Sequence, residues 1–111
     1  MTNPGLYLIM QIEENTMRVP REQLDFLKQN ILSRAQNAKI YLFGSRADKN
    51  RKGGDIDILI LSDDRLSFHD KSRIRYAFFE KYGEQKLDLV NFKFDEDSNF
   101  KELALMDAIE L

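Results

Sequence analysis

The sequence predicts an α/β fold in which a small mixed β-sheet is flanked by helices. Three observations predict it. Apolar residues at helical spacing alternate along the chain with short apolar runs of strand length. The 111 residues are enough to bury one hydrophobic core, but not two. Hydrophobic residues make up 42% and charged residues 32% of the chain, which is typical of a globular protein.

The chain divides into two parts. Residues 1–16 contain no strong pattern, and we treat them as an N-terminal extension of unknown role. Residues 17–111 form the predicted domain. Its first helix begins at Pro20, because proline suits a first helical turn, and ends near Asn37. Apolar residues at steps of three and four give this helix one stripe toward the core: Leu24, Leu27, Ile31 and Ala35.

Two strands follow the first helix. Residues 40–43 are a short apolar run bounded by Gly44, which predicts a buried strand. Residues 55–61 are apolar on both faces after their first three positions, which is typical of a central strand covered on both sides.

The second half of the chain predicts a helix, a strand and a last helix. Ser67 is a suitable N-cap for a helix that Gly83 ends. Residues 86–92 form the third strand, and residues 100–111 form the last helix. The apolar residues of this last helix occupy more than one row, so we expect a partner protein to cover part of it. Ordinary core packing with a frayed end is the alternative.

Composition excludes several classes of protein. The chain has no cysteine and one histidine, which excludes disulfide scaffolds, thiolate zinc sites, cysteine nucleophiles and multi-histidine metal sites. A net charge of −2 argues against direct DNA binding. The longest apolar run, residues 6–10, is too short to cross a bilayer and lacks the features of a signal peptide. We therefore expect a cytoplasmic protein without a membrane partner.

A pair of carboxylates predicts a metal site. Asp55 and Asp57 are two positions apart at the start of a strand, so their side chains share one face with Cα atoms about 7 Å apart. Two like charges this close repel each other unless a cation lies between them. Mg²⁺ suits such a site, because it binds one or two carboxylates together with water and substrate phosphates. The alternative is that both side chains are simply solvated at the strand start.

The turn before these carboxylates predicts a phosphate site. Gly44 permits close backbone approach to a ligand, Ser45 offers an N–H and a hydroxyl if a helical turn begins there, and Arg46 adds a charged donor. Alone, this tripeptide also fits an ordinary helix N-cap after a strand.

A third carboxylate lies in the third strand. Asp88 stands between Leu87 and Leu89, and a carboxylate in such a strand is costly to bury without a partner. We expect Asp88 to join the metal site. The alternative is an edge strand from which Asp88 faces water.

The combined pattern resembles a known signature. Gly44-Ser45-Arg46, eight further residues and Asp55-Ile56-Asp57-Ile58 are similar to the signature of the polymerase-β-type nucleotidyltransferase superfamily. Within it, the size resembles the minimal nucleotidyltransferases that are encoded beside helical HEPN-type partners. The resemblance covers residues 20–111 and implies a polymerase-β-like palm fold. The chain departs from many members at Asp48-Lys49, where a second glycine is common, and at Gly54, where a serine is common.

The resemblance also implies roles for the site residues. Gly44 and Ser45 would hold the nucleotide phosphates, Asp55 and Asp57 would bind two Mg²⁺ ions, and Asp88 would join them and help to activate the attacking hydroxyl. Independently of the resemblance, the charge of Arg46 predicts that it donates to phosphate oxygens.

These roles imply a magnesium-dependent nucleotidyltransferase. It would transfer AMP from ATP to a hydroxyl of a HEPN-type toxin and so act as an antitoxin, in a possible hetero-oligomer. Two alternatives stay open: a non-catalytic antitoxin that neutralises its partner by binding, and the catalytic subunit of a two-protein enzyme that modifies a small molecule. A glycosyltransferase with an Asp-x-Asp metal site is disfavoured, because the chain leaves no room for a nucleotide-sugar domain.

Overall fold

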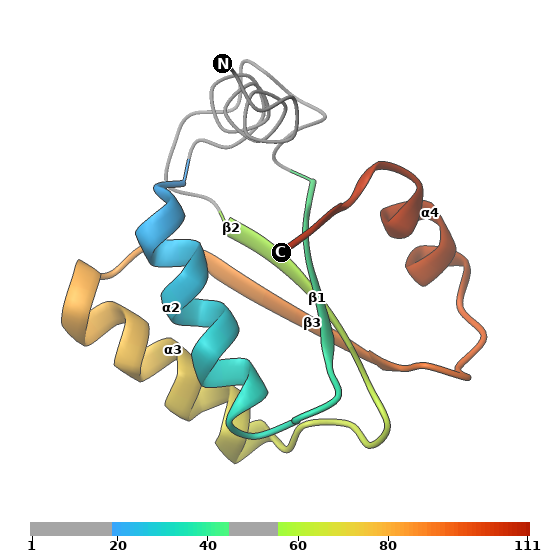
Figure 1. Cartoon of the computed structure of the whole chain (residues 1–111), viewed down its shortest axis with the longest axis horizontal. Coiled ribbons are helices and arrows are strands. Elements are labelled where there is room, and N and C mark those ends of the chain that lie inside the picture. Colours follow the sequence, from blue (N-terminus) through green and yellow to red (C-terminus); the bar gives the residue numbers. More distant parts are fainter. Residues whose placement is uncertain (1–18, 45–55) are drawn as a thin grey trace, which may run out of the picture.

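Four strands form one mixed sheet in the order β3-β2-β1-β4 within residues 19–44 and 56–111, the part of the chain that the computed structural model describes. Three helices accompany the sheet in this part of the chain (Figure 1). The elements are α2 (Arg21–Leu32), β1 (Lys39–Phe43), β2 (Ile56–Ser62), α3 (Phe68–Tyr82), β3 (Leu87–Lys93), α4 (Asn99–Asp107) and β4 (Ile109–Glu110). The predicted α/β fold with a small mixed sheet and flanking helices is confirmed.

The strand directions make the sheet mixed. β1 runs antiparallel to both β2 and β4, whereas β2 and β3 are parallel and are joined through α3. All seven residues of β2 are buried, as expected for a central strand covered on both faces. β3 is an edge strand, and its residues alternate between buried and partly buried up to Phe92, whereas the last residue, Lys93, is exposed.

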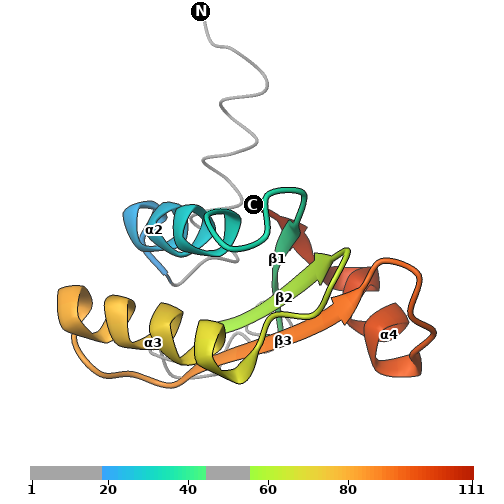
Figure 2. The ribbon, with the colours of Figure 1, turned by 90° about the horizontal axis from the view of Figure 1, so that it is seen from below.

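The two faces of the sheet are covered differently. One face, which includes Ile56, Ile58 and Ile60, forms the main hydrophobic core with the apolar stripes of α2 and α3. Both helices lie on this side of the sheet, and α4 lies on the other (Figures 1 and 2). The opposite face of β2 carries Asp57 and Leu59, and Leu59 is fully buried.

The helix boundaries follow local chemistry. The Ser67 hydroxyl accepts the N–H of Asp70 at 3.0 Å and begins α3, and Gly83 ends it with φ +91°. α2 ends at Leu32 instead of continuing toward Asn37. The chain turns there, and the N–H of Ala38 donates to the carbonyl of residue 35 at 3.1 Å. A turn is needed at this point because β1 begins at residue 39.

The C-terminal end corrects the predicted last helix. The helix over residues 100–111 was expected to be continuous, but α4 ends at Asp107, and Ala108 is extended with ψ 151°. Ile109 and Glu110 pair with β1 as β4, and the N–H of Leu111 donates to the carbonyl of Ile40 at 2.8 Å. The physical reason is that the edge of β1 offers backbone partners, while Ile109 and Leu111 pack against the main core. Part of the second apolar row therefore belongs to a strand.

The turn between β3 and α4 is held by side chains. The Lys101 ammonium donates to the carbonyls of Phe94 at 2.7 Å, Glu96 at 3.0 Å and Lys93 at 3.2 Å. The Glu96 carboxylate accepts the N–H of Lys93 at 3.1 Å and forms an ion pair with Arg65. These contacts fix where α4 begins relative to the sheet.

Candidate active site

Three side chains form a row across one face of the sheet. Phe43 in β1 is opposite Asp57 in β2, and Asp57 is opposite Asp88 in β3. Directly opposed positions in neighbouring strands place their side chains on the same face, and neighbouring strands lie about 4.8 Å apart. Two of the three predicted carboxylates are thus neighbours across the sheet, on the face opposite the main core.

Asp57 is the buried member of the pair, with 7% of its surface exposed. The glycine that follows β1 lies directly against it. A Cβ added to Gly44 would lie 2.6 Å from Oδ2 of Asp57 and 3.3 Å from its Cγ. Gly44 also has φ +75°, a conformation that side-chain-bearing residues rarely adopt. Backbone shape and space both require glycine here, and the turn after β1 meets the carboxylate at contact distance.

Asp88 lies at the outer side of this arrangement. It is partly buried near the start of β3, which is an edge strand. The edge position matches the alternative considered for this residue, but the register places it beside Asp57 rather than apart from it. The catalytic and metal-binding roles of Asp57 and Asp88 stay predictions.

The other predicted site residues lie outside the described residues. These are Ser45, Arg46 and Asp55, and the N-terminal extension over residues 1–16 lies there as well. Within residues 19–44 and 56–111, no three acidic or histidine side chains form a group that could hold a metal ion. Asp57 and Asp88 present carboxylate oxygens, which are the donors that Mg²⁺ prefers, so the described part of the site fits this ion.

An apolar hollow of about 290 Å³ adjoins the carboxylate row. Its wall includes the Phe100 ring, which meets the Phe43 ring edge to face at 5.9 Å between centroids and also contacts Phe92 at 6.1 Å. The residues around the hollow are Phe43, Gly44, Phe100, Leu103, Ala104 and Asp107. Sequence reasoning does not locate this hollow, although the extra apolar row of the last helix was a signal for it.

The pKa values of Tyr41, Lys71 and Glu96 depart from their usual values. Burial, and then the nearby Glu110 carboxylate, raise the pKa of Tyr41, which lies two residues before Phe43 in β1. Burial and the neighbouring arginines Arg75 and Arg65 lower the pKa of Lys71 on α3. The hydrogen bond from Arg65 lowers the pKa of Glu96, with a further contribution from the N–H of Lys93.

The family model described as a nucleotidyltransferase domain matches residues 20–111, nearly the whole chain. The chain belongs to this nucleotidyltransferase family. Gly44, Asp57 and Asp88 all lie within the matched range. None of the described helices is long and apolar enough to span a membrane.

Solved structures show the same nucleotidyltransferase fold at low sequence identity. A chain of the complex between the tri-AMPylated HEPN toxin and the MNT antitoxin of Shewanella oneidensis is 22% identical, with a TM-score of 0.52. The match covers 80% of this chain and 65% of that one, so this chain spans slightly less than two thirds of its relative.

A mutant of the MntA–HpeT toxin–antitoxin complex gives a TM-score of 0.59 at 21% identity, over 85% of this chain and 72% of that one. No curated protein matches the sequence. The likeness to these structures establishes the fold. The partners and substrates of those complexes are not carried over by it.

Proposed function

We propose that this nucleotidyltransferase transfers AMP from ATP to a hydroxyl of a HEPN-type helical protein encoded nearby, and so acts as an antitoxin in the cytoplasm, where ATP is available. The observation that carries the proposal is the row of Asp57 and Asp88 with Gly44 against the Asp57 carboxylate. A structural neighbour that contains an AMPylated HEPN toxin supports the choice of AMP and of a protein acceptor.

The first task of the site is to hold the nucleotide. Gly44 lets the backbone approach the phosphates, and Ser45 and Arg46 follow it in sequence as further donors. Asp55, Asp57 and Asp88 are the residues that would hold two Mg²⁺ ions. When bound, these ions offset the charge that develops on the attacking and leaving oxygens.

The second task is proton transfer. The acceptor oxygen forms a bond to the α-phosphorus of ATP, and the bond from that phosphorus to the oxygen bridging to the β-phosphorus breaks. Pyrophosphate leaves, and the acceptor carries an AMP ester. Asp88 takes the hydroxyl proton, since it is the more accessible of the two described carboxylates. Asp57, buried in the central strand, stays fixed and orients the site.

Intact-mass analysis tests this function. The product of the neighbouring gene, which we propose to be the HEPN-type partner, is incubated with this protein, ATP and Mg²⁺, and its mass is measured. We expect a gain of one or more AMP units, which disappears in EDTA and with the Asp57→Asn variant. An unchanged mass for a partner that nevertheless binds would favour the non-catalytic antitoxin. AMP incorporation into a small hydroxyl compound instead would favour the two-protein enzyme.

A further inference from the structure

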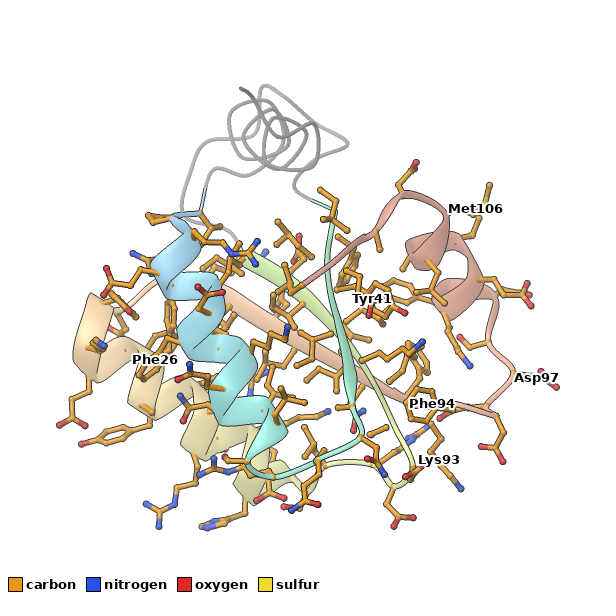
Figure 3. All side chains as sticks on the ribbon, in the orientation of Figure 1. Phe26, Tyr41, Lys93, Phe94, Asp97 and Met106 are labelled. Atoms are coloured by element: carbon orange, nitrogen blue, oxygen red, sulfur yellow. The ribbon has the colours of Figure 1, made fainter. Side chains whose placement is uncertain are left out.

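The outer side of α4 is an exposed apolar surface. Leu103 is 67% and Met106 78% exposed, and half of the Phe100 surface is also open to solvent. Figure 3 shows Met106 on the outside of α4, pointing away from the sheet. None of the nine residues of α4, all within the described part of the chain, is buried. We call the surface made by Phe100, Leu103 and Met106 the α4 face.

The α4 face continues into the candidate active site. Phe100 and Leu103 also line the apolar hollow whose far wall is Phe43 and Gly44. Gly44 in turn touches the Asp57 carboxylate. A molecule seated along α4 and in the hollow would therefore lie beside the reacting groups. An apolar surface in this place indicates a binding function, because helices of a small domain usually turn such residues inward.

Charge limits what this surface can bind. Residues 94–111 contain six acidic side chains and a single basic one, Lys101, whose ammonium is bound to three backbone carbonyls. The acidic residues are Asp95, Glu96, Asp97, Glu102, Asp107 and Glu110. Of these, Glu96 is ion-paired with Arg65. This acidic segment repels the triphosphate of ATP, so the nucleotide is a poor occupant of the outer surface of α4, away from the Gly44 turn. A second copy of this chain would bring the same acidic segment against itself, because two-fold contacts join identical surfaces.

We propose that the α4 face and its hollow dock the acceptor protein, through a segment of apolar side chains flanked by lysine or arginine. The apolar centre matches the α4 face, and the basic flanks match the acidic segment over residues 94–111. The segment lies near the hydroxyl that is modified, because the hollow ends at Gly44. This inference rests on the proposed function for the identity of the partner, but docking does not require that AMP transfer occur.

Paired variants test the docking. Leu103→Glu with Met106→Glu places charge on the α4 face without touching the core. Phe68→Glu with Tyr76→Glu is the matched control, since these two side chains are 82% and 66% exposed on α3. Affinity for the neighbouring HEPN protein is measured by calorimetry without nucleotide, with circular dichroism to verify folding. We expect at least a 30-fold loss for the α4 pair, less than a 3-fold change for the control, and weaker wild-type binding at high salt.

The outcomes separate the two proposals. An α4 variant that binds the HEPN protein as tightly as the wild type overturns the docking, and so does a wild type that does not bind it at all. If the wild type binds through α4 but adds no AMP to the partner, docking stands and the proposed transfer fails. If the α4 variant adds AMP to the partner at the wild-type rate, the transfer stands and docking fails.

Discussion

Gly44 and Asp57 occupy space that cannot hold one more carbon atom: a Cβ on Gly44 would lie 2.6 Å from Oδ2 of Asp57. Gly44 directly follows β1, which is antiparallel to β2, and Phe43, the last residue of β1, is opposite Asp57. The position of the carboxylate and the path of the turn therefore depend on each other. A ligand held by the backbone of Gly44 would lie beside a side chain that is already fixed.

Substitution of this glycine should damage activity more than stability. Gly44→Ala forces the Asp57 carboxylate to move and adds the backbone strain of a positive φ, which costs on the order of 1–2 kcal/mol. We expect the AMP-transfer rate to fall at least 10-fold, measured as AMP incorporated per folded molecule. Urea unfolding reports the stability loss separately.

Gly83→Ala is the control for this variant. Gly83 also has positive φ, at +91°, but an added Cβ there meets no atom within 4 Å. The control should lose stability through backbone strain alone and keep its transfer rate. Equal AMP-transfer rates of the Gly44→Ala and Gly83→Ala variants would show that the contact between Gly44 and Asp57 does not contribute to the reaction.

The two described carboxylates should have different effects on the reaction. If Asp88 accepts the hydroxyl proton, Asp88→Asn should lower turnover by roughly 10²–10⁴-fold while ATP affinity changes less. Asp55→Asn with Asp57→Asn should instead remove the dependence of ATP affinity on Mg²⁺, seen by calorimetry with Mg²⁺ and with EDTA. Asp64→Asn, an exposed carboxylate beyond the other end of β2, serves as the control. Near-normal turnover of the Asp88→Asn variant would contradict its role as proton acceptor. Asp88 would then be a solvated residue of the edge strand.

Much of the fold was predictable because the signals were local. Periodic apolar stripes, the Ser67 cap and the Gly83 stop define α3 without tertiary information. The continuous apolar run of β2 required cover on both faces, and the sheet places it centrally. Alternation along a strand also predicted that residue 57 would face away from its apolar neighbours at residues 56 and 58.

The rest depended on contacts between distant residues. Nothing local distinguishes a helix from a strand at Ile109, and its pairing with Leu42 decides the matter. The register that sets Asp57 beside Asp88 is likewise a property of the assembled sheet. The hollow beside Gly44 arises only when Phe100 packs on Phe43. Sequence patterns led to the expectation that Asp88 joins the carboxylate pair, but they did not predict the strand at Ile109 or the hollow.

The buried side-chain amide of Asn91 in β3 connects this strand to β2 and to Leu66, which lies just before α3. Oδ1 of Asn91 accepts the N–H of Leu66 at 2.6 Å, and its Nδ2 donates to the Ile60 carbonyl at 3.0 Å and the Ser62 hydroxyl at 2.9 Å. Asn91→Leu leaves the buried N–H of Leu66 without its acceptor, which costs about 1–3 kcal/mol. We expect urea unfolding to show this loss. Asn37→Leu, at an exposed amide, should change stability little, and comparable losses in both variants would contradict the role of the buried network.

The stability of the turn between β3 and the start of α4 should depend on pH, because the Glu96 carboxylate holds this turn. Its carboxylate accepts hydrogen bonds from the Arg65 guanidinium and from the N–H of Lys93, and the guanidinium is the main cause of a pKa below the usual 4.5. The stabilisation from this group is therefore fully present above pH 4.5, and it is lost as the pH falls through the lowered value in the folded state.

Amide hydrogen exchange of residues 93–103 provides the measurement. Exchange rates corrected for the intrinsic effect of pH should show protection of the start of α4 at pH 6 and its partial loss near pH 3. Glu96→Gln should remove most of this pH dependence and lower protection already at pH 6, because a neutral amide pairs less strongly with Arg65. Glu80→Gln, at an exposed residue of α3, should behave as the wild type. A Glu96 variant with an unchanged pH profile would mean that the three bonds from Lys101 hold this turn without help from the carboxylate.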